Sequence, residues 1–379
     1  MAFFAQLSRE HTYMHELVTN GHIDAILGNI AHGLPSGLHN FVAGGGRIFV
    51  DPLTFRIPLL GKNTGTRRFV QLPYVRNFTS LDSLTDPDDL RSFAELTVDE
   101  QIDEGATDII TPYFLIDDVR STTLETCVAA TEIALDAARR RGLDRVWTGI
   151  LVGGDELKRP ISRDRLLAVL TAGPVERCYL LVDVDQSGSG PLRDVQIIRA
   201  LREVVVELAK NDIRVLLGYA DPMAVCLTVD GLEDFASGVT ASLRRLNVTQ
   251  IRQGRRGHRP AARRYYMTAL MNFVRIDREL TAMMARGFLA GPGCGCGYCG
   301  SDFRAVTAAR KDALGRHYLA TLRHEASAIV VQPQANRLPY IRQRLSTAAL
   351  TYDALRRAGV QFEPDSGPGH IEAWQQALA

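Results

Sequence analysis

From about residue 40, short apolar runs alternate with amphipathic stretches, and this alternation constrains the fold more than any other feature of the sequence. The apolar runs, rich in β-branched residues, lie at 47–51, 108–117, 146–154, 178–185 and 213–221. Segments with apolar residues at helical spacing separate them, as at 124–142 and 194–212. Strands that are apolar on both faces and alternate with helices are typical of parallel sheets. The sequence therefore predicts an α/β fold.

Polar or glycine residues stand where these predicted strands end. They are Asp51, Asp117, the pair Gly153 and Gly154, Asp183, Asp185 and Asp221. In a closed parallel barrel, the loops after the strands gather over one face, where the chemistry takes place. The pattern favours a (β/α)8 TIM-type barrel over an open doubly wound sheet. No GxGxxG sequence follows one of these predicted strands and no P-loop is present, so a nucleotide-binding fold has no support.

The pattern changes after about residue 243. An Arg-rich polar stretch at 244–266 is followed by a helix-like segment, a cysteine cluster and mostly helical sequence. We therefore expect a barrel with an N-terminal extension at 1–290, a zinc-binding subdomain at 291–325 and a C-terminal helical tail at 326–379.

The charge balance and the apolar content exclude some classes of partner. With 44 basic and 43 acidic residues, the chain has no global field that attracts nucleic acid or an anionic membrane, so any such affinity needs a local patch. No apolar run reaches the length of a membrane span, and the N-terminus does not resemble a secretory signal. Three of the six cysteines are scattered singly in apolar surroundings. We expect a reduced, cytoplasmic protein with no membrane partner.

The densest group of potential metal ligands is Cys294-x-Cys296-x-x-Cys299, with glycines that let the backbone curl around an ion. A structural zinc takes four ligands, so a fourth is expected downstream. His317 and His324 both qualify, because seven residues on a helix return to the same face. An iron–sulfur cluster would need a fourth thiolate, which no nearby cysteine offers. The alternative is a glycine-rich turn with reduced thiols.

Such a cysteine cluster with a later histidine, on the C-terminal side of a barrel, resembles the tRNA-guanine transglycosylase family. That family exchanges guanine for a 7-deazaguanine base in tRNA or, in one branch, in DNA. The segment 313–322 is similar to the family's Leu-x-x-His-Asn-Leu ligand segment, which implies His317 as the fourth zinc ligand and His324 as the runner-up. The resemblance spans roughly 45–325.

The resemblance also implies a catalytic acid and a base pocket. The segment 47–57 resembles a family strand ending Thr-Asp-Ser-Gly-Gly-Phe-Gln, which implies Asp51 as the acid/base and Phe55 as a nearby aromatic. The run 108–123 is similar to the strand whose aspartate reads the edge of the base. The residue there is Asp117.

The glycine pair and the nucleophile come from two further segments. The run 149–154 resembles the Gly-Ile-Val-Gln-Gly-Gly segment beside the base, carried here by Gly153 and Gly154. At 232–247 the chain departs from the family, because Leu243 stands where the family has its nucleophilic aspartate. Leucine cannot attack a ribose carbon. Either the pairing of this segment with the family's is shifted, or another strand-end carboxylate such as Asp221 or Asp183 serves, or the chain does not catalyse exchange.

A run of arginines precedes the cysteine cluster, with no acidic residue inside it. Its members are Arg252, Arg255, Arg256, Arg259, Arg263 and Arg264. Exposed charge is often only solvated surface, but the family has a basic loop at this place that lies along its nucleic acid. The resemblance therefore implies contacts between these arginines and the phosphates of tRNA or DNA.

Three functions remain open from the sequence. The first is base exchange on guanine in tRNA or DNA. The second is a non-catalytic, base-binding or nucleic-acid-binding subunit that works beside an active transglycosylase partner. The third is an unrelated barrel enzyme that uses the strand-end carboxylates on a small molecule. A homodimer is compatible with each.

Overall fold

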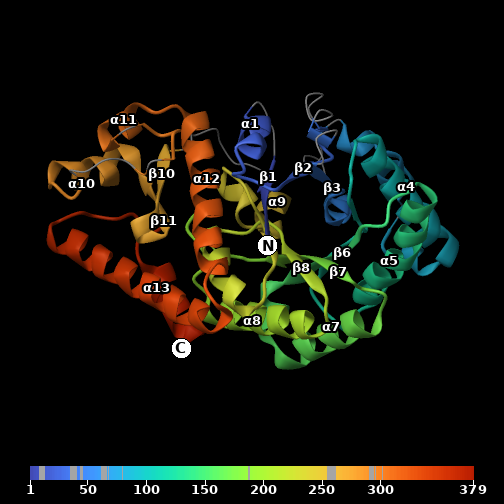
Figure 1. Cartoon of the computed structure of the whole chain (residues 1–379). Coiled ribbons are helices and arrows are strands. Elements are labelled where there is room, and N and C mark those ends of the chain that lie inside the picture. Colours follow the sequence, from blue (N-terminus) through green and yellow to red (C-terminus); the bar gives the residue numbers. More distant parts are fainter. Residues whose placement is uncertain are drawn as a thin grey trace.

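A ring of parallel strands forms the centre of the molecule. The computed structural model describes residues 1–7, 13–34, 41–42, 46–60, 66, 68–78, 80–186, 188–253, 262–289, 294, 296–300 and 302–379. The ring strands are β1 (Ala2–Gln6), β2 (Ala25–Asn29), β3 (Arg47–Asp51), β4 (Ile109–Ile110), β5 (Leu115–Ile116), β6 (Val146–Gly153), β7 (Arg177–Asp183), β8 (Arg214–Leu217) and β9 (Asp234–Ser237). Figure 1 shows them in the middle of the chain's fold.

The strand order makes the sheet a nearly closed barrel. The hydrogen-bonded path runs β3-β2-β1-β9-β8-β7-β6-β4, and β5 also pairs with β6. All these pairings are parallel, with Phe4 opposite Ala25 in β2. An isolated parallel bridge between Phe49 and Asp108 joins the two ends of the path. Strands β4 and β5 pair with β6 one after the other and so share one place in the ring. The predicted α/β class is confirmed, and the sheet is a nearly closed eight-strand parallel barrel.

Helices connect successive strands and cover the barrel from outside. They are α1 (Met14–Thr19), α3 (Pro73–Asn77), α4 (Pro87–Asp103), α5 (Thr123–Arg140), α6 (Gly154–Lys158), α7 (Pro160–Ala172), α8 (Val195–Lys210) and α9 (Val248–Gln253), with short turns η2 (Thr54–Leu59), η3 (Phe69–Gln71), η4 (Asp82–Thr85), η5 (Pro222–Asp230) and η6 (Ala241–Leu243). Helix α8 begins where the Asp194 side chain accepts hydrogen bonds from the amides of Gln196 and Ile197. It buries Leu201, Val205 and Leu208 at helical spacing.

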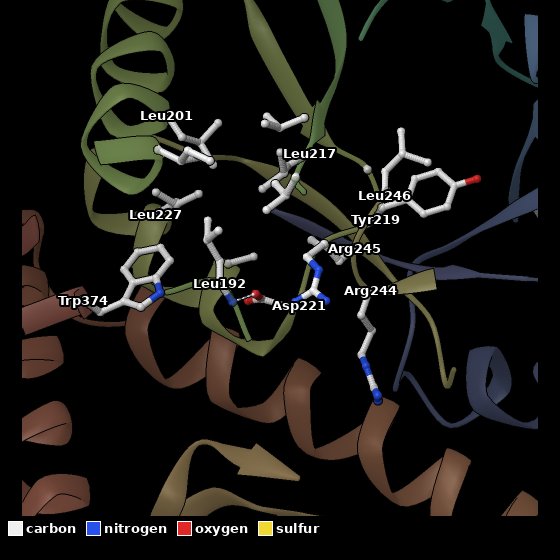
Figure 2. Close-up of a pocket in the computed structure, with 16 residues that line it drawn as sticks. Leu192, Leu201, Leu217, Tyr219, Asp221, Leu227, Arg244, Arg245, Leu246 and Trp374 are labelled. Carbon is white, nitrogen blue, oxygen red and sulfur yellow. Dashed lines mark hydrogen bonds between the residues drawn. The ribbon is translucent and has the colours of Figure 1, made fainter. Parts of the chain in front are cut away.

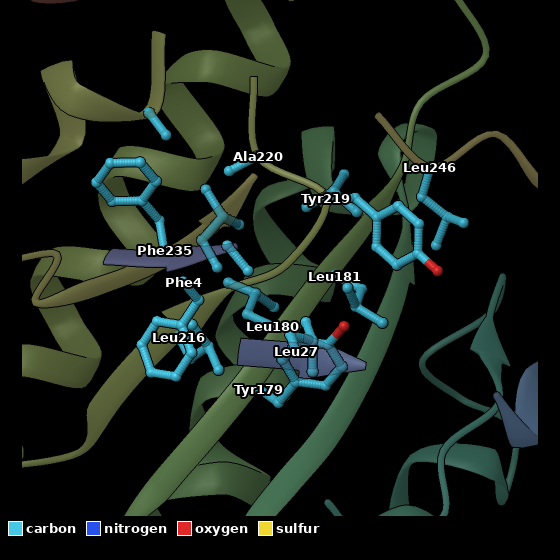
Figure 3. Packing of buried hydrophobic residues seen from close by; sticks show 14 of the residues in the cluster. Phe4, Leu27, Tyr179, Leu180, Leu181, Leu216, Tyr219, Ala220, Phe235 and Leu246 are labelled. Atoms are coloured by element: carbon cyan, nitrogen blue, oxygen red, sulfur yellow. The ribbon is translucent and has the colours of Figure 1, made fainter. Parts of the chain in front are cut away.

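Aromatic and aliphatic side chains fill the barrel interior. The Phe4 ring meets Phe49 edge-on at 4.9 Å, and Phe49 meets Trp147 at 5.6 Å between ring centroids. Figure 3 shows Tyr179 and Tyr219 in this apolar packing, with their hydroxyl groups at its edge. The barrel is therefore a packed core in which each polar tip needs a partner.

The C-terminal third lies against one side of the barrel (Figure 1). It contains β10 (Arg264–Met267), η7 (Thr268–Leu270), β11 (Asn272–Arg275), η8 (Ile276–Leu280), α10 (Thr281–Ala285), α11 (Phe303–Ala308), α12 (Lys311–Val330), α13 (Gln334–Arg357) and α14 (Gly369–Leu378). Strands β10 and β11 pair as an antiparallel hairpin where the sequence predicted a helix-like segment. The segment 326–379, predicted as a helical tail, contains α13 and α14. Helix α14 packs on α8 of the barrel.

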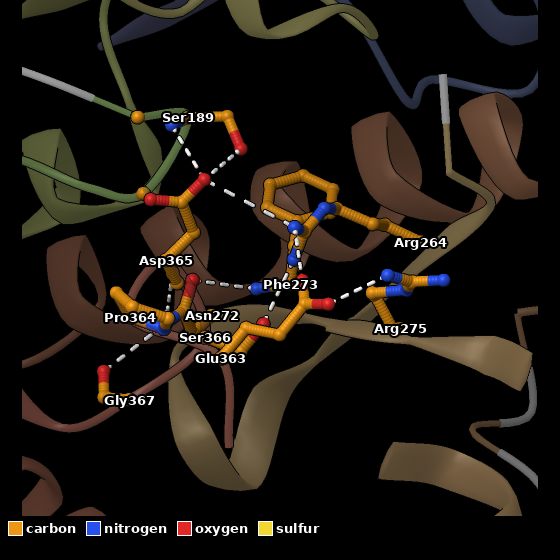
Figure 4. Close-up of polar contacts among 12 residues, drawn as sticks. Ser189, Arg264, Asn272, Phe273, Arg275, Glu363, Pro364, Asp365, Ser366 and Gly367 are labelled. Carbon is orange, nitrogen blue, oxygen red and sulfur yellow. Dashed lines mark hydrogen bonds and ion pairs between the residues drawn. The ribbon is translucent and has the colours of Figure 1, made fainter. Parts of the chain in front are cut away.

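The tail is tied to the hairpin and to the loop after β7 by charged contacts (Figure 4). The Glu363 carboxylate accepts hydrogen bonds from Arg264 at 3.0 Å and from Arg275 at 2.6 Å. The Asp365 carboxylate accepts from the amide and the hydroxyl of Ser189, at 2.8 and 2.7 Å. The predicted tail and the barrel are thus joined by direct contacts.

Three barrel strands fall outside the predicted runs. Strands β1 and β2 precede residue 40, and β9 lies in the segment 232–247, between the last predicted strand and the arginine-rich stretch. Each is only four or five residues long, which is too short for the spacing of apolar residues to identify a strand. In the described part of the chain, no helix combines the length and apolar composition needed to cross a membrane.

Candidate metal centre and barrel-core carboxylate

Four potential metal ligands converge beside the hairpin. The Sγ atoms of Cys294, Cys296 and Cys299 and the Nδ1 atom of His317 all lie within 4.8 Å of one another. Cys294 Sγ is 3.2 Å from Cys299 Sγ and 3.1 Å from His317 Nδ1. Three sulfur donors and one imidazole are a usual ligand set for structural zinc. These residues, named here the Cys3His cluster, can hold a metal ion.

Neighbouring groups orient the histidine of the Cys3His cluster. Its Nε2 lies 2.8 Å from the carbonyl oxygen of Tyr266 on β10, so an Nε2–H can donate there and leave Nδ1 for a metal. The Tyr265 ring stacks on the imidazole, with 4.4 Å between centroids and 14° between planes. His317 is fully buried on α12. The hairpin therefore holds the imidazole against the thiols.

His324 stands on the same helix but outside the cluster. Seven residues correspond to about 10 Å along a helix axis, which is too far for a second ligand to the same ion. His324 is exposed, whereas His317 is buried. His317, the ligand implied by the resemblance, is therefore the histidine that completes the cluster.

The cluster thiols differ chemically from the isolated cysteines. Hydrogen bonds among the cluster thiols lower the pKa of Cys296 and raise the pKa of Cys299. Burial raises the pKa of Cys127 to about 12, and that of Cys178 likewise to about 12. Only thiolates bind metal, so burial keeps the isolated thiols in the neutral, non-ligating form.

Asp51 ends β3 in the barrel interior and is 2% exposed. Its Oδ1 accepts hydrogen bonds from the Tyr113 hydroxyl at 2.6 Å and from the Leu53 amide at 2.9 Å. Its Oδ2 accepts from the Tyr179 hydroxyl at 3.2 Å. Burial raises the pKa of Asp51, and the hydrogen bond from Tyr113 opposes this effect. The result is a carboxyl group that keeps a proton to higher pH than an ordinary aspartate.

The residues after Asp51 hold this arrangement in place. Leu53 has a left-handed backbone, with φ at 54°, which is unusual for a branched side chain. The Thr54 hydroxyl donates to the Tyr113 carbonyl at 2.6 Å, and the Tyr113 amide donates back to it at 2.7 Å. Phe55 is buried, and its ring stacks on Tyr113 at 5.7 Å. Phe55 thus lies next to a partner of Asp51, in line with the expected neighbourhood.

Sequence reasoning missed Tyr113 and Tyr179. Each lies in a buried apolar run, where an aromatic residue is read as core packing. The signal that could have found them is that a phenol buried at a strand needs a hydrogen-bond partner. Asp51, at the end of a neighbouring predicted strand, is such a partner.

The residues expected to read a base lie at the ends of β5 and β6. Asp117 is exposed. A Cβ at Gly153 would meet the Ile116 carbonyl oxygen only at 3.6 Å, so that glycine has ordinary space around it. A Cβ at Gly154 would come within 2.9 Å of the Asp183 carbonyl oxygen, so the close approach of β6 to β7 requires glycine there. Among the described residues, no hydrogen bond joins Asp117 to Asp51.

The alternative carboxylates are used as backbone acceptors. The Asp221 side chain accepts from the amides of Met223 at 2.8 Å and Leu192 at 2.6 Å, and burial raises its pKa. Asp183 accepts from the Val248 amide at 2.8 Å. Leu243 is buried in η6. The residue that the resemblance implies at the nucleophile position is therefore apolar and enclosed.

A cavity of about 50 Å³ lies between β7, β8, α8 and η5 (Figure 2). Apolar side chains form most of its wall, and Asp221, Arg244 and Arg245 lie at its edge. This volume is large enough to hold at least one ordered water molecule. Asp51 is not part of its lining.

The arginine stretch divides into two groups. Arg252 is exposed at the end of α9. Arg263 donates to the carbonyl of Thr307 at 3.0 Å, and Arg264 pairs with Glu363 at 3.0 Å. These two side chains therefore bind the protein itself. Three further candidates, Arg255, Arg256 and Arg259, lie outside the described residues.

No protein-family model matches the chain, and no curated protein matches its sequence. The candidate sites therefore rest on their own residues and geometry.

Proposed function

We propose that the chain is a transglycosylase-like protein that exchanges guanine for a 7-deazaguanine base in tRNA or DNA. The observation that carries the proposal is the Cys3His cluster, in which residues of the implied motif converge beside a parallel barrel. Base exchange by this fold also needs carboxylates at the carboxyl ends of strands, and Asp51 stands at such an end.

The barrel is proposed to be of the (β/α)8 TIM type. If β4 and β5 count as one place in the ring, the strands follow one another around it in chain order, and the last, β9, pairs with β1. Helices or helical turns join most successive strands. This order is that of a TIM-type barrel.

The metal is proposed to be one structural zinc per chain. Four protein ligands leave no open position, so the ion would hold the three cysteines against α12 and supply no catalytic chemistry. A reducing compartment such as the cytoplasm keeps the thiols available for it.

The proposed chemistry is displacement at C1′ of the target nucleotide. An oxocarbenium-like state forms there, which one carboxylate stabilises or traps while another group moves the proton of the base. Asp51, with its raised pKa, is suited to carry that proton. Asp221, after β8, is the proposed nucleophile, and Asp117 with Gly153 and Gly154 is proposed to contact the base.

The polymer is proposed to lie along the arginine stretch. Arg252 is exposed, and the candidates Arg255, Arg256 and Arg259 follow it in the sequence. Neutralised phosphates release counterions, so binding should fall steeply with salt. Reversing the charge of Arg255 and Arg256 should weaken binding of all sequences alike.

A second candidate is a non-catalytic subunit that binds base or nucleic acid beside an active partner. It is favoured by the buried Leu243 at the nucleophile position and by the engagement of both Asp51 oxygens by protein donors. In this case the chain supplies binding surface and the partner supplies the nucleophile.

Labelled guanine, incubated with the protein and separately with tRNA and duplex DNA, tests the two candidates. Incorporation that Asp51→Asn abolishes and the exposed control Asp144→Asn retains would support exchange. A protein–nucleic acid adduct that survives denaturation and disappears in Asp221→Asn would identify the nucleophile. Binding without incorporation or adduct would support the subunit. If neither polymer binds at low salt, both fail and a small-molecule barrel enzyme is the better hypothesis.

A further inference from the structure

Arg244 is a buried cation without a charged partner. It follows η6, is 7% exposed and forms no ion pair with any described residue. Its Nη1 is shielded from solvent and has no hydrogen-bond partner. Its guanidinium lies 3.6 Å from the centroid of the Phe273 ring and 5.5 Å from that of Tyr318. Figure 2 shows the side chain leaving the cavity edge, away from the apolar wall.

The charges around Arg244 do not balance it. Arg245 and Arg264 add positive potential at this guanidinium, and Asp221 adds negative potential. Arg264 is paired with Glu363, whereas Arg245 bonds backbone carbonyls, including that of Gly190 at 2.6 Å. Both Asp221 oxygens already accept from backbone amides. One positive charge therefore remains uncompensated by a described contact.

Asp365 does not change this balance. Its carboxylate is bound by the amide of Ser189, lies 4.0 Å from Arg264 and adds negative potential at Arg245. A buried guanidinium is unfavourable unless an anion pairs with it and takes up its free N–H groups. Stacking on an aromatic ring orients the guanidinium plane but satisfies none of those donors.

The position of Arg244 indicates which anion fits. It lies in the loop after β9, the last strand of the ring, next to the loop after β8 that carries Asp221. In parallel barrels, the loops after the last two strands often bind phosphate. The planar fork of a guanidinium matches two phosphate oxygens.

We propose that Arg244 binds a phosphate group, and that in the working protein this group belongs to the nucleic acid. The anion site rests on Arg244 and its surroundings, whereas the assignment of the phosphate to a polynucleotide rests on the proposed function. The fork of Arg244 would hold the phosphate near the target nucleotide, and the Phe273 ring would keep the guanidinium plane in place.

The test compares wild type, Arg244→Gln and the matched control Arg140→Gln, an exposed arginine on α5 that pairs with Glu95. Calorimetry measures binding of inorganic phosphate and of a trinucleotide, with acetate at equal ionic strength as the blank. Affinity for the phosphate ligands should fall about 10- to 100-fold in Arg244→Gln only. In the same variant, the slope of log affinity for tRNA or DNA against log salt concentration should become shallower by about one, which corresponds to the loss of one phosphate contact.

The outcomes separate the site from the polymer. Loss of phosphate binding with an unchanged salt slope would support the anion site and overturn its assignment to a polynucleotide. Equal phosphate affinity in the three folded proteins would overturn the site. If Arg244→Gln does not fold, NMR of the wild-type protein provides the test. The Nε–H resonance of Arg244 is identified by its absence from the spectrum of Arg244→Lys. A shift on adding phosphate supports the site, and no shift overturns it.

This result is independent of the exchange assay. Phosphate binding that needs Arg244, in a protein that incorporates no guanine, would leave the anion site standing and remove the proposed exchange. If wild type incorporates guanine but Arg244→Gln keeps its phosphate affinity, the proposed exchange stands and the anion site is overturned.

Discussion

The Cys3His cluster and the Asp51 site are built in opposite ways. Three of the four cluster ligands lie within six sequence positions, and the histidine follows on the next long helix. Asp51 receives its hydrogen bonds from Tyr113 and Tyr179, which are 62 and 128 residues away in the chain. A site assembled from neighbours is visible as spacing, whereas a site assembled across a barrel is not.

The two sites also differ in what they can hold. Three sulfur atoms and one imidazole converge in the Cys3His cluster, which is a ligand set for a metal cation. Burial raises the pKa of Asp51, which favours the neutral, protonated form. The cluster can therefore hold a cation, and the carboxyl group of Asp51 favours a proton.

Removal of one thiolate should have the largest effect. Cys299→Ala should lose the metal and lower the free energy of unfolding by more than about 3 kcal/mol, because metal binding contributes directly to folding. Elemental analysis and denaturant unfolding measure both quantities. The control Cys127→Ala removes an equally buried thiol outside the cluster and should keep the metal. Metal retained in Cys299→Ala would contradict the closed site.

The two histidines of α12 sharpen the assignment of the fourth ligand. His317→Ala should weaken metal affinity by at least about 100-fold, and His324→Ala should leave it unchanged. Competition with a chelator measures the affinity. Equal affinity in the two variants would show that His317 is not a ligand.

The barrel-core carboxylate should reveal itself through pH. The folded state keeps the Asp51 proton at pH values where the unfolded chain, with an ordinary pKa near 3.9, has lost it. The stability of wild type should therefore fall as pH rises from about 4 through the raised pKa, by about 1.4 kcal/mol per pH unit in that window. Asp51→Asn should lack this component, and Asp144→Asn should keep it. If the free energy of unfolding depends on pH in the same way in Asp51→Asn and in wild type, the raised pKa is contradicted.

The smallest effects should come from the two phenols. Tyr113→Phe removes the 2.6 Å hydrogen bond and should cost about 1–3 kcal/mol. Tyr179→Phe removes the 3.2 Å bond and should cost about 0.5–1.5 kcal/mol. Urea unfolding at neutral pH measures both costs. The reverse order would indicate that Tyr179 carries the main interaction with Asp51.

The sequence predicted the barrel class only in part. The runs at 178–185 and 213–221 contain β7 and β8, because fully buried strands are apolar throughout. The hairpin of β10 and β11 was missed, since its two four-residue strands enclose a helical turn that suits a helix equally well. Local patterns of this length do not distinguish a strand from a helix.

What the sequence alone determined is the chemistry that is local in the chain: the thiol spacing of Cys294, Cys296 and Cys299, the aspartate that ends β3, and the alternation of strands and helices. Tertiary structure decided the rest. It selected His317 over His324, surrounded Asp51 with phenols and buried the Arg244 guanidinium away from every acidic side chain that could pair with it among the described residues. The reason is physical, because desolvation and hydrogen-bond geometry depend on which distant segments pack together, and spacing along the chain does not record that.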